Sequence, residues 1–67
     1  MNNLIQNAKN EIVNTNNEFG YVAGDLEIAA EIWHGYLSVE QRLEIMRANN
    51  ITKSVKDAYK AIAEMMK

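Results

Sequence analysis

The sequence predicts an all-α fold, a small single-domain bundle of four short helices. Apolar residues recur at intervals of three and four along four segments, which is the spacing that places side chains on one face of a helix. Hydrophobic residues make up 48% of the chain, which argues against disorder. Its 67 residues contain no proline linker, internal repeat or low-complexity tract, so we expect one domain over residues 1–67. A core of this size supplies about 3 to 5 kcal/mol, and a chain without cysteine has no disulfide to add to it.

The segment 25–36 is expected to be the central helix, because its apolar residues cover two adjacent faces. One face consists of Leu26, Ala29, Ala30, Trp33 and Leu37. The second face consists of Ile28, Ile32 and Tyr36. The polar side chains Glu27, Glu31 and His34 are left to form a narrow ridge, which we expect to face water. A helix that is apolar on two faces needs neighbours on two sides, so the other helices should pack around it.

A helix over residues 3–14 and a helix over residues 53–66 are predicted near the two ends of the chain. The first has a narrow apolar stripe of Leu4, Ile5, Ala8 and Ile12. The last has the clearest amphipathic pattern in the chain, with Val55, Ala58, Tyr59, Ile62 and Met66 in one arc and lysines opposite. Thr52 or Ser54 is placed to cap its first turn.

A third helix is predicted over residues 39–48, because Ser38 and Gln41 have the spacing of a capping box. Its inner stripe is expected to be Val39, Leu43 and Met46, with Ile45 beside them. Its outward-facing residues are expected to be Arg42, Glu44 and Arg47. The pair at 49–50 suits the end of this helix, since asparagine tolerates the left-handed conformation found at such ends.

Residues 14–24 interrupt the helical pattern with five polar residues, two glycines and three larger apolar side chains. Two interpretations stay open. In the first, Phe19, Tyr21 and Val22 plug the end of the bundle, and in the second one of the two aromatic residues stays on the surface for a partner. Because long connections between helices often carry function, this segment is a candidate binding loop as well as a candidate plug.

The residues that could support chemistry are few. Glu27, Glu31 and His34 share a helix face and include one Glu-x-x-His pair, the spacing that di-iron bundles use. Such a site needs a second pair and two more glutamates, whereas this chain has one histidine. No nucleophile is placed beside His34 and no glycine-rich phosphate loop is present. We therefore expect no enzymatic activity, no metal, no cofactor and no small-molecule substrate.

The composition also bears on location. No stretch approaches the roughly 18 apolar residues of a membrane span, and residues 1–7 lack the basic and apolar regions of a secretion signal. The absence of cysteine fits an intracellular compartment. We therefore expect a soluble, cytoplasmic protein without a membrane partner.

Charge is divided unevenly along the chain, although the net charge is only −2. Residues 1–37 contain one lysine and five acidic residues. Residues 38–67 contain six basic and four acidic residues. Such polarity can mark an interaction surface, or it can help the two halves of the fold attract each other.

Protein binding through an apolar patch is the leading functional hypothesis. Apolar residues outnumber what a bundle of this size buries easily, and a surplus of this kind often forms an interface. The chain would then be a small regulatory or adaptor protein that binds a protein partner or forms a homo-oligomer. The residues predicted to make the contact are Phe19, Tyr21, Tyr36 and Ile45.

Nucleic acid binding is the alternative hypothesis. The two helices on either side of the turn at 49–52 have the general form of a helix-turn-helix reader. The candidate contact residues are Arg42, Arg47, Lys53, Ser54, Lys56 and Lys60. Two features weigh against it: the chain is acidic overall, and Asn50 replaces the glycine common in such turns. Salt separates the hypotheses, because phosphate binding weakens steeply as salt rises and apolar docking does not.

Overall fold

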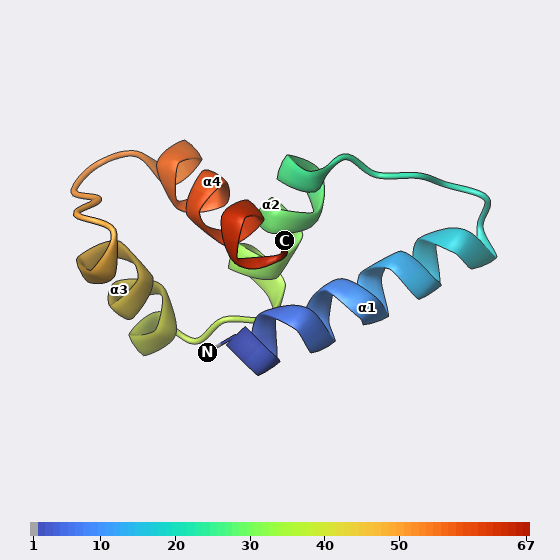
Figure 1. Cartoon of the computed structure of the whole chain (residues 1–67), viewed down its shortest axis with the longest axis horizontal. Coiled ribbons are helices and arrows are strands. Elements are labelled where there is room, and N and C mark those ends of the chain that lie inside the picture. Colours follow the sequence, from blue (N-terminus) through green and yellow to red (C-terminus); the bar gives the residue numbers. More distant parts are fainter. Residues whose placement is uncertain (1) are drawn as a thin grey trace.

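The computed structural model describes residues 2–67, and over this range it is a small all-α bundle of four helices without strands, as the sequence predicts. The helices are α1 (Asn2–Glu18), α2 (Asp25–Gly35), α3 (Val39–Ala48) and α4 (Val55–Met65). Figure 1 shows α2 and α4 at the centre, α1 along one side, and α3 at the end away from the α1–α2 loop. The bundle is elongated, with principal extents of 36 × 19 × 19 Å. Within residues 2–67, no helix has the length and apolar character needed to cross a membrane.

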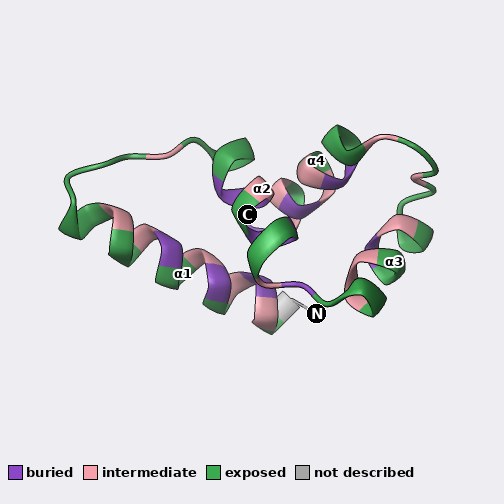
Figure 2. Cartoon of the chain, turned by 180° about the vertical axis from the view of Figure 1, so that it is seen from behind, coloured by how far each residue is buried: buried purple, intermediate pink, exposed green. Residues whose placement is uncertain are grey.

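The core is built around the packing of α2 against α4. Ala29 and Ile32 of α2 and Ala58 and Ile62 of α4 are fully buried. Helix α1 contacts both central helices, whereas α3 packs mainly against α4. Figure 2 shows the buried positions as stripes on α1, α2 and α4, and only one short buried stretch on α3. The predicted central place of α2 is therefore confirmed, and its ridge of Glu27, Glu31 and His34 is exposed as expected.

Helix α1 ends in a motif that depends on one left-handed residue. Gly20 has φ 69°, its amide donates to the Asn17 carbonyl at 3.1 Å, and the Tyr21 amide donates to the Asn16 carbonyl at 2.9 Å. The helix therefore continues to Glu18, and its predicted end four residues earlier is wrong. The asparagines that suggested that end cost a helix only about 0.7 kcal/mol each, whereas the residue that can take the left-handed conformation comes later.

Helix α3 ends in the same motif, with Asn50 in place of glycine. Asn50 has φ 55°, and the Ile51 amide donates to the Met46 carbonyl at 2.9 Å. At the other end, Ser38 Oγ accepts from the Gln41 amide at 3.1 Å, and Gln41 Oε1 accepts from the Ser38 amide at 2.8 Å. The predicted capping box and the predicted stop at asparagine are both confirmed.

The C-terminal end of α2 is capped by an arginine from α3. Arg42 Nε donates to the Trp33 carbonyl at 2.9 Å, and Arg42 Nη2 donates to the His34 carbonyl at 3.3 Å. The guanidinium also lies 5.9 Å from the centre of the Trp33 ring. These carbonyls belong to the last turn of α2, where the helix supplies no partner of its own and a cation is favoured.

This contact turns α3 away from its predicted orientation. Arg42 points inward, where an outward position was expected, and Ile45 is the one buried residue of the helix. Val39 is 68% exposed and Leu43 is 42% exposed, although both were expected in the inner stripe. The spacing of apolar residues therefore groups side chains on one face of α3. The hydrogen bonds of Arg42 decide which face of the helix packs against the rest of the bundle.

Helix α4 is capped at both ends. Ser54 Oγ accepts from the Asp57 amide at 3.3 Å, so Ser54 is the N-cap. At the C-terminal end, Gln6 Nε2 and Lys9 Nζ of α1 donate to the Met66 carbonyl at 3.1 and 3.3 Å. Side chains of α1 thus cap the C-terminal end of α4.

Replacing Ile32 by Ala is expected to leave the chain largely unfolded at 25 °C. Ile32 is fully buried, and this truncation costs about 2 to 5 kcal/mol, which is comparable to the whole expected stability of about 3 to 5 kcal/mol. Ile32→Val, at about 0.5 to 1.5 kcal/mol, should remain folded. Urea titration followed by circular dichroism measures both, with Val39→Ala as the exposed control; an unchanged midpoint for Ile32→Ala would contradict this account of the core.

Replacing Arg42 by Ala is expected to lower the free energy of unfolding by about 1 to 2 kcal/mol. The change removes two charge-assisted hydrogen bonds and the contact with the Trp33 ring. Arg47→Ala is the matched control, because Arg47 lies on the exposed face of the same helix. Urea denaturation of the two variants gives the comparison, and equal losses would mean that the capping of α2 contributes nothing measurable.

Candidate functional site

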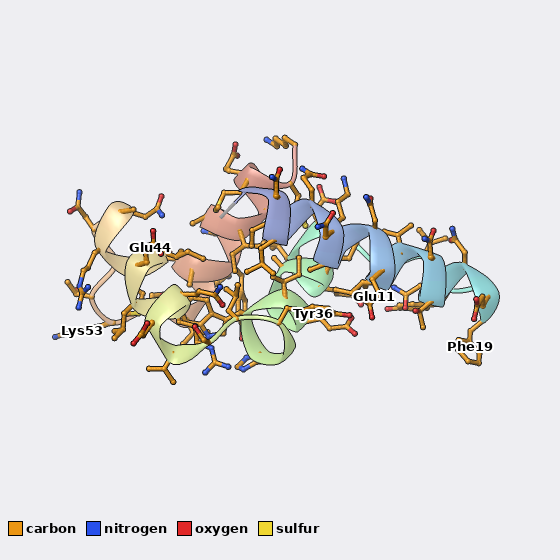
Figure 3. The ribbon with its side chains drawn as sticks, turned by 90° about the horizontal axis from the view of Figure 1, so that it is seen from below. Glu11, Phe19, Tyr36, Glu44 and Lys53 are labelled. Atoms are coloured by element: carbon orange, nitrogen blue, oxygen red, sulfur yellow. The ribbon has the colours of Figure 1, made fainter. Side chains whose placement is uncertain are left out.

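The most exposed apolar side chains lie in the loop between α1 and α2. Phe19 is 82% exposed, Val22 is 88% exposed, and Tyr21 between them is half-exposed. The interpretation of this segment as a core plug is therefore wrong, and these three residues form what we call the tip surface. Helix α1 extends past α2 and carries the loop to one end of the molecule, where Figure 3 places Phe19.

The loop is held in place by hydrogen bonds at its start and by packing near its end. The hydrogen bonds around Gly20 fix the turn that follows the helix, and Ala23 packs partly against the core. A loop held in this way presents its apolar side chains in one arrangement, which reduces the entropy lost when a partner binds.

Tyr21 connects the loop to the first turn of α2. Its hydroxyl donates to Glu27 Oε2 at 2.5 Å. The hydrogen bond to Glu27, followed by the negative charge of that carboxylate, raises the pKa of the Tyr21 hydroxyl above its usual value of 10.0. This bond spans six residues and closes the loop over the start of the helix.

The surroundings of the tip surface are acidic. Glu18 precedes Phe19, and Asp25 and Glu27 occupy the first turn of α2. No lysine or arginine occurs between Lys9 and Arg42 in the sequence. A partner with basic groups around an apolar contact would therefore be complementary to this end of the molecule.

A small hollow of about 60 Å³ lies behind the tip surface, lined by Val13, Asn16, Asn17, Tyr21, Val22, Ala23 and Ile28. Ligand pockets typically occupy about 300 to 1,000 Å³. This hollow is too small for a cofactor and reflects imperfect packing beneath the loop.

Tyr36 does not belong to the tip surface. It packs partly against the core, and Figure 3 places it near Glu11 in the middle of the molecule, well away from Phe19. Burial is the main cause that raises the pKa of the Tyr36 hydroxyl, and the charges of Glu11 and Glu31 raise it further. Its location favours a structural role at the contact of α1 and α2.

Ile45 does not belong to the tip surface either. It is 3% exposed and belongs to the core. The sequence pattern placed it beside the inner stripe of its helix, and the rotation of α3 brings it fully inward. Of the four predicted contact residues, only Phe19 and Tyr21 are exposed, and both lie in the loop between α1 and α2.

The residues of the nucleic acid hypothesis are divided between internal and exposed positions. Arg42 caps α2 and Ser54 caps α4, so both side chains already have partners within the fold. The other four, Arg47, Lys53, Lys56 and Lys60, are exposed. Asp57 lies between the last two lysines on α4, which reduces the net positive charge of that face.

The ridge of α2 has no arrangement suited to a metal. Over residues 2–67, no group of three or more His, Cys, Asp or Glu side chains is placed to hold a metal ion. His34 Nε2 and the Tyr59 hydroxyl form a hydrogen bond of 2.6 Å, and their rings meet edge to face with centres 5.8 Å apart. The histidine therefore contributes to the contact between α2 and α4.

Sequence reasoning did not include Val22 among the contact residues, although it is as exposed as Phe19. Its position between Gly20 and Gly24, in a segment without helical pattern, is the available signal for a loop residue. Nothing in the sequence separates a buried loop valine from an exposed one, because that depends on how far α1 extends beyond α2.

Comparison of the chain with protein-family models, with curated proteins and with solved structures found no match. The functional hypothesis therefore rests on the tip surface and the charges around it.

Replacing Glu27 by Ala is expected to move the pKa of Tyr21 back toward 10.0. The pKa of Tyr36 should stay raised, because burial is its main cause. A raised pKa in the folded state means that the Tyr21 contribution to stability is present below the unfolded-state pKa and is lost as pH rises through the folded-state pKa. Titration of the tyrosine Cζ resonances by NMR measures both groups, and an unchanged Tyr21 curve would rule out the bond to Glu27.

Proposed function

We propose that this chain is a small, non-enzymatic regulatory or adaptor protein that binds another protein through the tip surface. The observation that carries the proposal is the near-complete exposure of Phe19 and Val22 on a loop held in place by Gly20 and Tyr21. Single exposed apolar residues are common, whereas two large ones three positions apart on a loop held by hydrogen bonds are a candidate contact. The proposal includes the cytoplasmic location expected from the composition.

The tip surface is small, so the partner must supply a receptive pocket. Full burial of a valine or phenylalanine side chain is worth about 1.5 to 3 kcal/mol each. Loss of translational and rotational freedom costs about 4 kcal/mol or more. The affinity therefore depends on Tyr21 and on the acidic residues around the loop, in addition to the two apolar side chains.

Charge indicates the chemistry of the partner. In the sequence, Glu18 precedes the tip surface and Asp25 and Glu27 follow it, and no lysine or arginine occurs in residues 10–41. An apolar pocket with lysine or arginine at its edge is the complementary surface. Because apolar contacts contribute alongside the charges, salt should weaken this binding less steeply than it weakens phosphate binding.

Replacing Phe19 and Val22 together by Ser is expected to reduce capture of the physiological partner from cell extract at least tenfold. Each removed contact is worth about 1.5 kcal/mol or more, and about 1.4 kcal/mol corresponds to a factor of ten. Folding should be unaffected, because both side chains are exposed in the free chain. Circular dichroism checks the fold, and quantitative mass spectrometry of the captured proteins measures the loss.

Two control variants make this result interpretable. Val39→Ser removes an exposed valine from α3, away from the tip surface, and should retain the partner. Changing Lys53, Lys56 and Lys60 together to Gln should also retain it. If the lysine variant loses the partner while the tip variant keeps it, or if bound material is nucleic acid released by salt, the alternative hypothesis of nucleic acid binding replaces this proposal.

A further inference from the structure

An apolar hollow lies toward the end of the molecule opposite the tip surface. It has a volume of about 140 Å³, opens to solvent, and is lined by Glu44, Ile45, Ala48, Asn49 and Met65. Its walls come from α3 and the last turn of α4. Figure 3 places Glu44 at the end of the long axis away from Phe19, on the side where Lys53 also lies.

The size and lining of this hollow suit one aromatic ring. An enclosed cavity of about 150 Å³ with apolar walls accommodates benzene, so a hollow of about 140 Å³ has room for one phenyl ring. Ile45, Ala48 and Met65 supply aliphatic and thioether walls of this kind. At its edge, the Asn49 side chain donates one N–H to the Ile45 carbonyl at 2.8 Å.

We propose that the hollow receives Phe19 of a second copy of this chain, so that copies associate head to tail. Phe19 is the most exposed aromatic side chain of the described residues, and a phenyl ring matches the volume of the hollow. This inference rests on the proposed function of the tip surface, and it identifies the binding partner as a second copy of the chain.

Charge complementarity supports this occupant. The tip surface lies in the half of the chain with one lysine and five acidic residues, whereas the hollow lies in the half with six basic and four acidic residues. Arg47 is adjacent to Ala48 in sequence and is exposed. Glu44 is the one charged residue of the lining and has the same sign as Glu18 of an incoming copy. The exposed Lys53 lies at the same end of the molecule and, with Arg47, carries the opposite charge.

The two sites lie toward opposite ends of a molecule 36 Å long, so a chain cannot fill its own hollow. The contact is therefore heterologous: one surface of a copy meets a different surface of the next. Such contacts build open chains or rings, and each copy keeps one tip and one hollow for further neighbours.

The test uses two variants that each block one side of the contact. Phe19→Ser removes the ring and leaves the hollow intact. Ala48→Lys places a charge over the hollow and leaves the tip intact, and it should not disturb the fold, because Ala48 is exposed and a cation is favourable in the last turn of a helix. Sedimentation equilibrium measures the mass of each protein between about 50 μM and 2 mM, a range suited to a small interface.

The wild-type mass is expected to rise with concentration beyond twice the chain mass of 7.6 kDa. Each variant alone should remain a monomer, and the equimolar mixture should reach a limit at two chains, since one functional contact remains. Val39→Ser should associate as the wild type does. Only the Phe19→Ser chain is isotope-labelled for NMR. In the mixture, the methyl resonances of its Ile45 and Met65 should shift, because the Phe19 ring of the Ala48→Lys chain enters the hollow and exerts a ring current.

A wild-type chain that stays at 7.6 kDa throughout, or a mixture no heavier than its components, overturns the head-to-tail contact. So does a mixture in which the Ile45 and Met65 methyl resonances do not move. These outcomes leave the proposed function standing if capture of a different protein still depends on Phe19 and Val22. If neither capture nor self-association responds to those substitutions, both proposals fail.

Discussion

The packing of α2 against α4 is the contact on which the rest of the structure depends. Fully buried alanines on both helices, Ala29 and Ala58, allow their backbones to approach closely, since the distance between packed helices follows the size of the side chains between them. The bond between His34 and Tyr59 joins the same two helices at their exposed edge. Helices α1 and α3 then pack on this pair from different directions.

The outer helices α1 and α3 bind the central pair through the unpaired backbone carbonyl groups at the ends of α2 and α4. Every α-helix leaves its last carbonyls without internal partners, and α2 and α4 receive donors for them from other helices: Arg42 from α3 and Gln6 from α1. By contrast, α1 and α3 end in local turns at Gly20 and Asn50. The central helices thus depend on tertiary contacts for their ends, whereas the outer helices end through their own sequence.

These helix ends also shape the two surfaces proposed for binding. Helix α1 ends at the turn of Gly20, so Phe19 lies at one end of the molecule. The surrounding residues 10–41 contain no lysine or arginine. The inward position of Arg42 rotates α3 so that Ile45 is buried and Ala48 borders a hollow at the other end. One elongated molecule therefore presents an acidic apolar tip and, opposite it, an apolar hollow in its more basic half.

Sequence alone determined the four helices, the capping box at Ser38, the stop at Asn50 and the exposed ridge of α2, because each follows from local hydrogen bonding or from the 3.6-residue period. The local stop at Gly20 was also encoded, although the prediction placed the end of α1 too early. The sequence did not determine the face that α3 turns inward or the exposure of Phe19. Periodicity groups residues on one face of a helix but does not say which neighbour that face meets. That choice was made by a hydrogen bond from Arg42 across nine residues and by the position of α1 against α2, and both exist only once the helices are packed.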